Sequence, residues 1–200
     1  MKTKTIELYE FDELPEDVKA DVIEKHRDIN VDYDWAKWSL EGHEERLEAL
    51  GFNDPDISFS GFCSQGDGAS FTCKSVDLVK FLKGQKALTR FKSLVNMEKS
   101  ETGEFIASVD RFDHHYCHEH TVKAGVEVNW FDDEEQEIQE GLSKMGDELQ
   151  TLITETVRTL SKKIYRELES EYEYLTSDEE IIETLKANEY TFTASGRMES

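Results

Sequence analysis

Four of the six histidines lie within one short stretch, residues 114–120. Imidazole rings exchange protons near neutral pH and bind transition metals. If the stretch is extended, His114, His118 and His120 share one face, while Glu119 points to the opposite one and is poorly placed as a base. His118 and His120 would then bind Zn²⁺, with His114 or a distant carboxylate as the third ligand and an open water position. Otherwise they would donate hydrogen bonds to a phosphate, or form a polar strand or turn without a ligand.

A second polar segment, residues 64–70, reads Ser-Gln-Gly-Asp-Gly-Ala-Ser and separates two predicted strands. Its two glycines permit a tight hairpin turn, and they also let backbone N–H groups approach a phosphate or carboxylate. The segment lacks the spacing of known phosphate loops, and the Asp67 carboxylate would repel an anion unless it turns away. Our candidate ligand-binding residues are Ser64, Gln65, Gly66, Asp67, Gly68, Ser70, Lys74, His118 and His120.

Motifs with firm catalytic spacing are missing from the sequence. It contains no HExxH motif, no CxxC pair and no HxT phosphodiesterase pair. Its three cysteines indicate reduced thiols, and a Cys63–Cys73 bridge is compatible with the spacing but not required. We therefore expect a binding protein rather than an enzyme, and no cofactor unless a transition metal occupies the histidine stretch.

The net charge of −22 is concentrated at the two ends of the chain. Residues 1–50 hold 15 acids and 7 bases (−8), residues 51–130 hold 11 and 9 (−2), and residues 131–200 hold 19 and 7 (−12). Such a surface argues against general binding of nucleic acid or of an anionic membrane, and no apolar run is long enough to span a bilayer.

The middle third carries a basic run, which would form either a solvated helix face or a surface that accepts an anion. Between residues 74 and 92, Asp77 is the single acid beside six basic residues, which are Lys74, Lys80, Lys83, Lys86, Arg90 and Lys92.

Hydrophobic periodicity places these segments on an α+β fold, a mostly antiparallel sheet with helices packed on it and a long C-terminal amphipathic helix. The predicted strands cover residues 3–9, 57–63, 69–73, 104–109, 121–130 and 190–193. The predicted helices begin near Pro15 and cover 33–50, 75–97, about forty residues from 132, and 177–187. Gly51 is expected to end one helix, Gly84 to kink or divide another, and Ser177 to cap the last one.

We expect an α+β domain over residues 1–131 and a helical arm with a short terminal strand over 132–200, packed on the same domain. Trp35 and Trp38, at i and i+3, are expected on one buried helix face. The apolar stripe of the long helix must be buried somewhere, so residues 132–172 predict a homo-oligomer seam.

Three motifs together resemble a family of small tailed-bacteriophage proteins. They are Leu8-Tyr-Glu-Phe-Asp-Glu-Leu, the hairpin Phe59-Ser-Gly-Phe-Cys-Ser-Gln-Gly-Asp-Gly-Ala-Ser-Phe, and Tyr116-Cys-His-Glu-His-Thr; the ending Glu189-Tyr-Thr-Phe-Thr-Ala-Ser-Gly-Arg is also similar. Cys63 departs from the tryptophan expected at its position. The resemblance implies an accessory phage protein in the cytoplasm of the host cell, and an anti-defence role enters only with the first hypothesis below.

Three functions follow as hypotheses. The first is non-catalytic binding of a small anionic, nucleotide-like ligand at the two polar segments. The second is inhibition of a host nucleic-acid enzyme by acidic residues that mimic duplex phosphates, which makes a host protein the partner. The third is metal-dependent hydrolysis at the histidine stretch.

Overall fold

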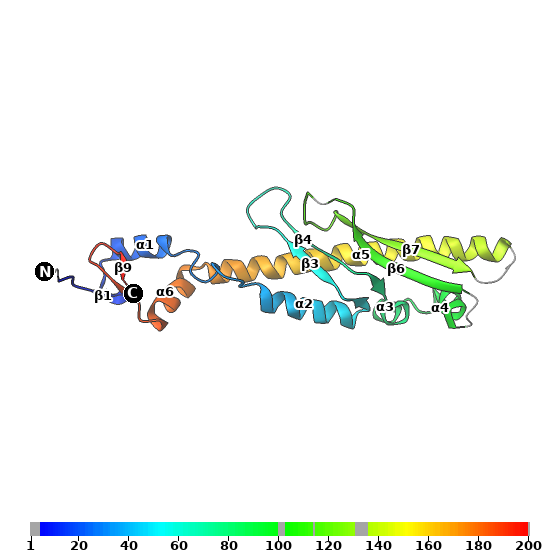
Figure 1. The fold of residues 1–200 in the computed structure, drawn as a ribbon, viewed down its shortest axis with the longest axis horizontal. Coiled ribbons are helices and arrows are strands. Elements are labelled where there is room, and N and C mark those ends of the chain that lie inside the picture. Colours follow the sequence, from blue (N-terminus) through cyan, green and yellow to red (C-terminus); the bar gives the residue numbers. More distant parts are fainter. Residues whose placement is uncertain (1–4, 100–102, 114, 131–135, 200) are drawn as a thin grey trace, which may run out of the picture. The chain divides into compact units, whose positions relative to one another are not determined.

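The computed structural model describes residues 5–99, 103–113, 115–130 and 136–199, and it has the expected α+β fold with a long C-terminal helix (Figure 1). The chain forms two compact units. The smaller unit joins the chain up to Lys37 with the chain from Leu168 onward, and the larger unit covers Trp38–Glu167. The division expected after residue 131 stays a prediction.

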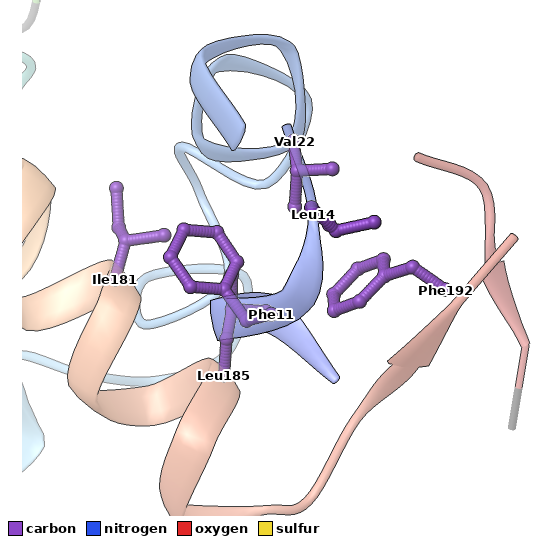
Figure 2. Packing of buried hydrophobic residues seen from close by; sticks show 6 residues of the cluster. All are labelled: Phe11, Leu14, Val22, Ile181, Leu185 and Phe192. Carbon is purple, nitrogen blue, oxygen red and sulfur yellow. The ribbon is translucent and has the colours of Figure 1, made fainter. Parts of the chain in front are cut away.

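The smaller unit packs two helices against a small antiparallel sheet. The sheet order is β1-β8-β9, and the strands are Tyr9–Glu10, Thr191–Phe192 and Met198–Glu199. A 3-10 helix (Phe11–Glu13), α1 (Glu16–Lys25) and α6 (Asp178–Ala187) complete it. Figure 2 shows its buried side chains, which are Phe11, Leu14, Val22, Ile181, Leu185 and Phe192. Phe11 and Phe192 meet edge to face, with ring centroids 6.4 Å apart.

Local signals set the helix ends of this unit. Ser177 is the N-cap of α6, as predicted, and its hydroxyl accepts a hydrogen bond from the Glu180 N–H at 3.3 Å. The strand predicted over residues 3–9 is wrong for the part that the structure describes, where only Tyr9 belongs to a strand. Ile6 and Leu8 are about half exposed because β1 pairs with β8 over two residues only.

The larger unit is built from two antiparallel hairpins and the helices around them. One hairpin pairs β3 (Asp56–Phe59) with β4 (Ala69–Thr72), and the other pairs β6 (Gly103–Arg111) with β7 (Val122–Trp130). Mutual backbone hydrogen bonds of Cys73 and Val109, at 3.0 and 2.9 Å, join the two hairpins. The remaining elements are β2 (Phe52–Asn53), β5 (Ser75–Val76), α2 (Lys37–Ala49), α3 (Leu78–Gly84), α4 (Lys92–Lys99) and α5 (Gln136–Leu175).

Within the larger unit, α5 runs along β7. The Thr154 hydroxyl accepts a hydrogen bond from the Ala124 N–H at 3.1 Å, and a Cβ on Gly146 would lie 3.2 Å from a methyl of Val128. The apolar stripe is buried here at Leu149, Ile153, Val157 and Ile164. Because the chain covers these residues itself, the stripe no longer requires a partner, and the oligomer seam stays a prediction.

Two glycines near α2 and α3 act as predicted. Gly51 follows α2 with a φ of +100°, and a Cβ there would lie 2.9 Å from the Asp77 carbonyl oxygen. The helix expected over 75–97 is divided after Gly84 into α3 and α4. Its first residues instead form β5, which pairs with β2.

The prediction that Trp38 is buried is wrong. Trp38 is 77% exposed, whereas Trp35 is half-buried with its ring 5.9 Å from that of Tyr172. The i, i+3 rule fails because α2 begins at Lys37, so Trp35 precedes the helix. Across the described residues, no helix is both long and apolar enough to cross a membrane.

The three cysteines are free thiols in different environments, which predicts an order of alkylation. Cys63 is exposed, Cys117 is half-buried and Cys73 is buried. Burial raises the pKa of Cys73 to about 11. The charge of Asp110 adds to this increase, and a hydrogen bond from the Val109 backbone opposes it. Because the thiolate is the reactive form, we expect Cys63 to react first with a disulfide reagent at pH 7.5 and Cys73 to react only on unfolding. Peptide mapping after timed labelling checks this, and early labelling of Cys73 would contradict it.

Candidate functional site

The two polar segments lie against each other at the same end of the two hairpins (Figure 1). An added Cβ on Gly68 would lie 2.5 Å from the His118 Cβ and 2.6 Å from its Cα, and one on Gly66 would lie 3.0 Å from the Tyr116 ring. Only glycine therefore permits this approach. We call residues 62–68 and 115–120 together the tip surface.

Asp67 folds back into its own loop. Its Oδ2 atom accepts hydrogen bonds from the N–H groups of Cys63 at 3.0 Å and Ser64 at 2.6 Å. The Gly68 N–H donates to the Ser60 hydroxyl at 3.1 Å. The Asp67 carboxylate thus occupies two N–H groups that an anion would otherwise bind. The exposed side chains of Ser64 and Gln65 are the polar groups of the loop that a ligand can still reach.

Two candidate residues lie away from the tip surface. Ser70 is fully buried in β4, where its hydroxyl accepts a hydrogen bond from Nη2 of Arg111 at 3.2 Å. Lys74 follows the other end of β4, five residues after Ala69, a span of about 16 Å in extended chain. The basic run that continues into α3 and α4 therefore begins at the end of β4 that is remote from the loop.

Four aromatic rings form a row on the histidine side of the tip surface. Neighbouring centroids are 5.8 Å apart from His115 to Tyr116, 5.8 Å from Tyr116 to His118, and 5.9 Å from His118 to His120. Tyr116 is 46% exposed. The expected alignment of His118 and His120 on one side is thus present, although a turn closed by the Thr121 N–H on the His118 carbonyl ends the extended chain.

Glu119 does not point away from the histidines as expected. The turn brings its Oε1 to 3.1 Å from Nζ of Lys162 on α5 and 3.5 Å from Nε2 of His120. Burial alone would raise the pKa of Glu119. Its own backbone N–H, the hydrogen bond and charge of Lys162, and the charge of His120 outweigh burial and lower that pKa below its ordinary value.

The geometry of the described histidines gives no support to a metal site. Nδ1 of His118 accepts the His120 N–H at 3.1 Å, so the proton of the neutral ring sits on Nε2. Nε2 of His120 faces Glu119. His114, the third expected ligand, lies outside the described residues. In the part of the chain that is described, no group of three His, Cys, Asp or Glu side chains is placed to hold a metal ion.

Sequence reasoning missed the contribution of α5 to this site. Besides Lys162, Tyr165 donates a hydrogen bond to the Gly61 carbonyl at 3.3 Å, and its ring centroid lies 5.5 Å from that of Phe62. Tyr165 lies 104 positions from Gly61, and Lys162 lies 43 positions from Glu119, so no local spacing in the sequence signals these contacts. Two exposed rings, Phe112 and Tyr116, were visible in the sequence only as neighbours of the histidines.

Gly68→Ala tests the packing of the two segments. The new Cβ would displace the His118 backbone, and we expect the free energy of unfolding to fall by about 1–3 kcal/mol. Gly141→Ala on α5 is the matched control, because nothing lies within 4 Å of its Cβ position and alanine favours helix, so stability should rise by up to about 1 kcal/mol. Urea denaturation measures both changes. Equal effects of the two substitutions would show that the close approach is not present.

Glu119→Gln tests the ion pair with Lys162 through its pH dependence. At pH 7 we expect a loss of about 1 kcal/mol. Because the folded-state pKa is depressed, this contribution exists above the unfolded-state pKa and is lost as pH falls through the folded-state value. The deficit should therefore shrink between pH 5 and pH 3 in chemical denaturation. Glu127→Gln at an exposed position of β7 is the control, and a deficit independent of pH would contradict the assignment.

Comparison with known proteins identifies the family of the chain without a function. No curated protein and no solved structure matches it. The family described as Domain of unknown function (DUF8835) matches residues 35–178. This match includes the whole larger unit, with both segments of the tip surface, and all of α5. Since it covers more than half of the 200 residues, the chain belongs to the family Domain of unknown function (DUF8835).

Proposed function

We propose that this protein binds a small anionic, nucleotide-like ligand at the tip surface without turning it over. The observation that carries the proposal is the close approach of Gly66 and Gly68 to Tyr116 and His118. It brings a polar loop and a ring-rich segment, 50 residues apart in both contacting pairs, onto one surface. A structural turn alone has no need of a second segment packed against both of its glycines.

The ring row suits a planar base. Tyr116 and His118 are tilted by only 31° with centroids 5.8 Å apart, and an exposed tyrosine face stacks on any nucleobase. Exposed Ser64 and Gln65 supply neutral donors and acceptors beside it. Because Asp67 already occupies the loop's N–H groups, the rings rather than a backbone cradle would provide most of the contact.

An anionic group of the ligand would meet the cations of α5 and the turn. Glu119 is shared between Lys162, with 57% of its side chain exposed, and His120, with 61% exposed. One carboxylate thus faces two groups that carry positive charge when protonated. Both side chains are open to solvent, so an anionic group can reach the Lys162 ammonium and the His120 ring although the whole chain carries −22.

The biological setting of the proposal comes from the sequence resemblance. A ligand-binding accessory protein of a tailed bacteriophage would act in the cytoplasm of the host, where a nucleotide-derived signal of host defence fits the chemistry of the tip surface. Sequestration of such a signal needs affinity but no catalytic group.

Tyr116→Ala tests the proposal directly. Loss of one base-stacking contact, worth about 1–3 kcal/mol, should weaken binding by about 5- to 150-fold. Tyr116→Phe should retain it. Tyr174→Ala, which removes a similarly exposed tyrosine from the smaller unit, should leave affinity unchanged. Isothermal titration calorimetry against cyclic and linear mono- and dinucleotides measures these affinities. The proposal fails if none of these nucleotides binds, or if Tyr116→Ala and Tyr174→Ala behave alike.

A further inference from the structure

A cavity lined by residues other than those of the tip surface lies between α2 and α5 inside the larger unit. Its volume is about 260 Å³, and both helices contribute apolar side chains to it. Leu47 and Ile164 are buried, while Leu50 and Leu160 are half-buried. We call this cavity the α2–α5 cleft.

The cleft arises because the apolar stripes of α2 and α5 face each other but do not fill the space between the two helices. Leu47 and Leu50 are spaced i, i+3 on and just beyond α2, and Leu160 and Ile164 are spaced i, i+4 on α5, so each pair lies on one side of its helix. The half-buried members leave apolar surface in contact with solvent. An apolar ligand of limited size would remove that surface from water.

The rim of the cleft is cationic. Arg46 and Lys163 line it, and both reach the carboxylate of Glu167, at 3.0 Å and 3.6 Å. Nε2 of His43 lies 3.5 Å from the same carboxylate. One negative charge therefore faces two permanent positive charges beside an apolar cavity, in a chain with nearly twice as many acids as bases.

Both rim cations have hydrogen-bonding capacity beyond this carboxylate. The Arg46 guanidinium has five N–H donors, of which Nε binds the Gly42 carbonyl at 2.9 Å and Nη1 binds Glu167. Its position is thus fixed by its own helix. The side chains of Arg46 and Lys163 are 56% and 64% exposed, so a ligand reaches them from solvent.

We propose that the α2–α5 cleft binds a small amphipathic carboxylate, with its hydrocarbon part between Leu47, Leu50, Leu160 and Ile164 and its carboxylate at Arg46 and Lys163. The volume lies just below the 300–1,000 Å³ of drug-sized sites, which limits the occupant to a short chain or one ring. Apolar walls with a cationic rim select a molecule that has both parts. The site is separate from the tip surface, and its existence does not depend on the nucleotide proposal.

Linear carboxylates test the cleft. Isothermal titration calorimetry with hexanoate, octanoate, decanoate and dodecanoate, below micelle formation, should give saturable binding to the full chain. Each added methylene should lower Kd by about fourfold until the cleft is filled. Decanol and the decyltrimethylammonium cation should bind at least tenfold more weakly than decanoate, because they cannot pair with the rim.

Two variant pairs locate the binding. Ala49→Phe fills the mouth at the last residue of α2 and should abolish decanoate binding. Ala187→Phe makes the same change at the exposed last residue of α6 and should preserve it. The double variant R46Q/K163Q should weaken decanoate about tenfold while leaving decanol unchanged. Circular dichroism confirms that each variant is folded.

Three results would overturn the proposal. They are no binding of any carboxylate in the series, equal binding to the Ala49→Phe and Ala187→Phe proteins, and equal affinity for decanoate and the decyltrimethylammonium cation. The proposal is supported if the affinity rises with the length of the carboxylate in the original protein and in Ala187→Phe, but not in Ala49→Phe.

Discussion

The contact between α5 and the two hairpins holds the larger unit together. A two-stranded hairpin is marginally stable in water, and a long helix gains most of its stability by burying an apolar face. Here the helix and the hairpins stabilise each other. Ile153 and Val157 of α5 are fully buried, and the Thr154 hydroxyl of α5 accepts a hydrogen bond from the Ala124 N–H of β7. Both candidate surfaces also depend on α5, through Lys162 at the tip surface and Leu160 at the cleft.

At two places on this acidic chain, cationic side chains gather around a single carboxylate. With 23 basic against 45 acidic side chains, the net charge of the chain repels anions. Glu119 faces Lys162 and His120, whereas Glu167 faces Arg46, Lys163 and His43, so each group includes a lysine of α5. Single ion pairs of this exposure contribute little to stability. In the two proposals made here, they mark the places where an anion would approach a chain of charge −22.

Local signals predicted much of the fold, and contacts between distant residues account for what was missed. The hydroxyl of Ser177 and the conformational freedom of Gly51 act within one turn, so sequence spacing was sufficient. The exposure of Trp38 depends on where α2 begins, which periodicity locates only to within a few residues. The turn at Glu119 is accompanied by a partner 43 residues away, Lys162, which no spacing rule identifies.

The Asp67 carboxylate changes what the glycine-rich loop can recognise. Two consecutive N–H groups, from Cys63 and Ser64, point at one oxygen of this side chain. Such an arrangement is the usual way a backbone binds phosphate, and here the chain supplies the anion itself. These two hydrogen bonds brace the loop without a ligand, which would lower the ordering cost of the proposed binding. Under the proposed function, selectivity would come from the rings that pack against Gly66 and Gly68, and these glycines would act through packing rather than through direct contact with a ligand.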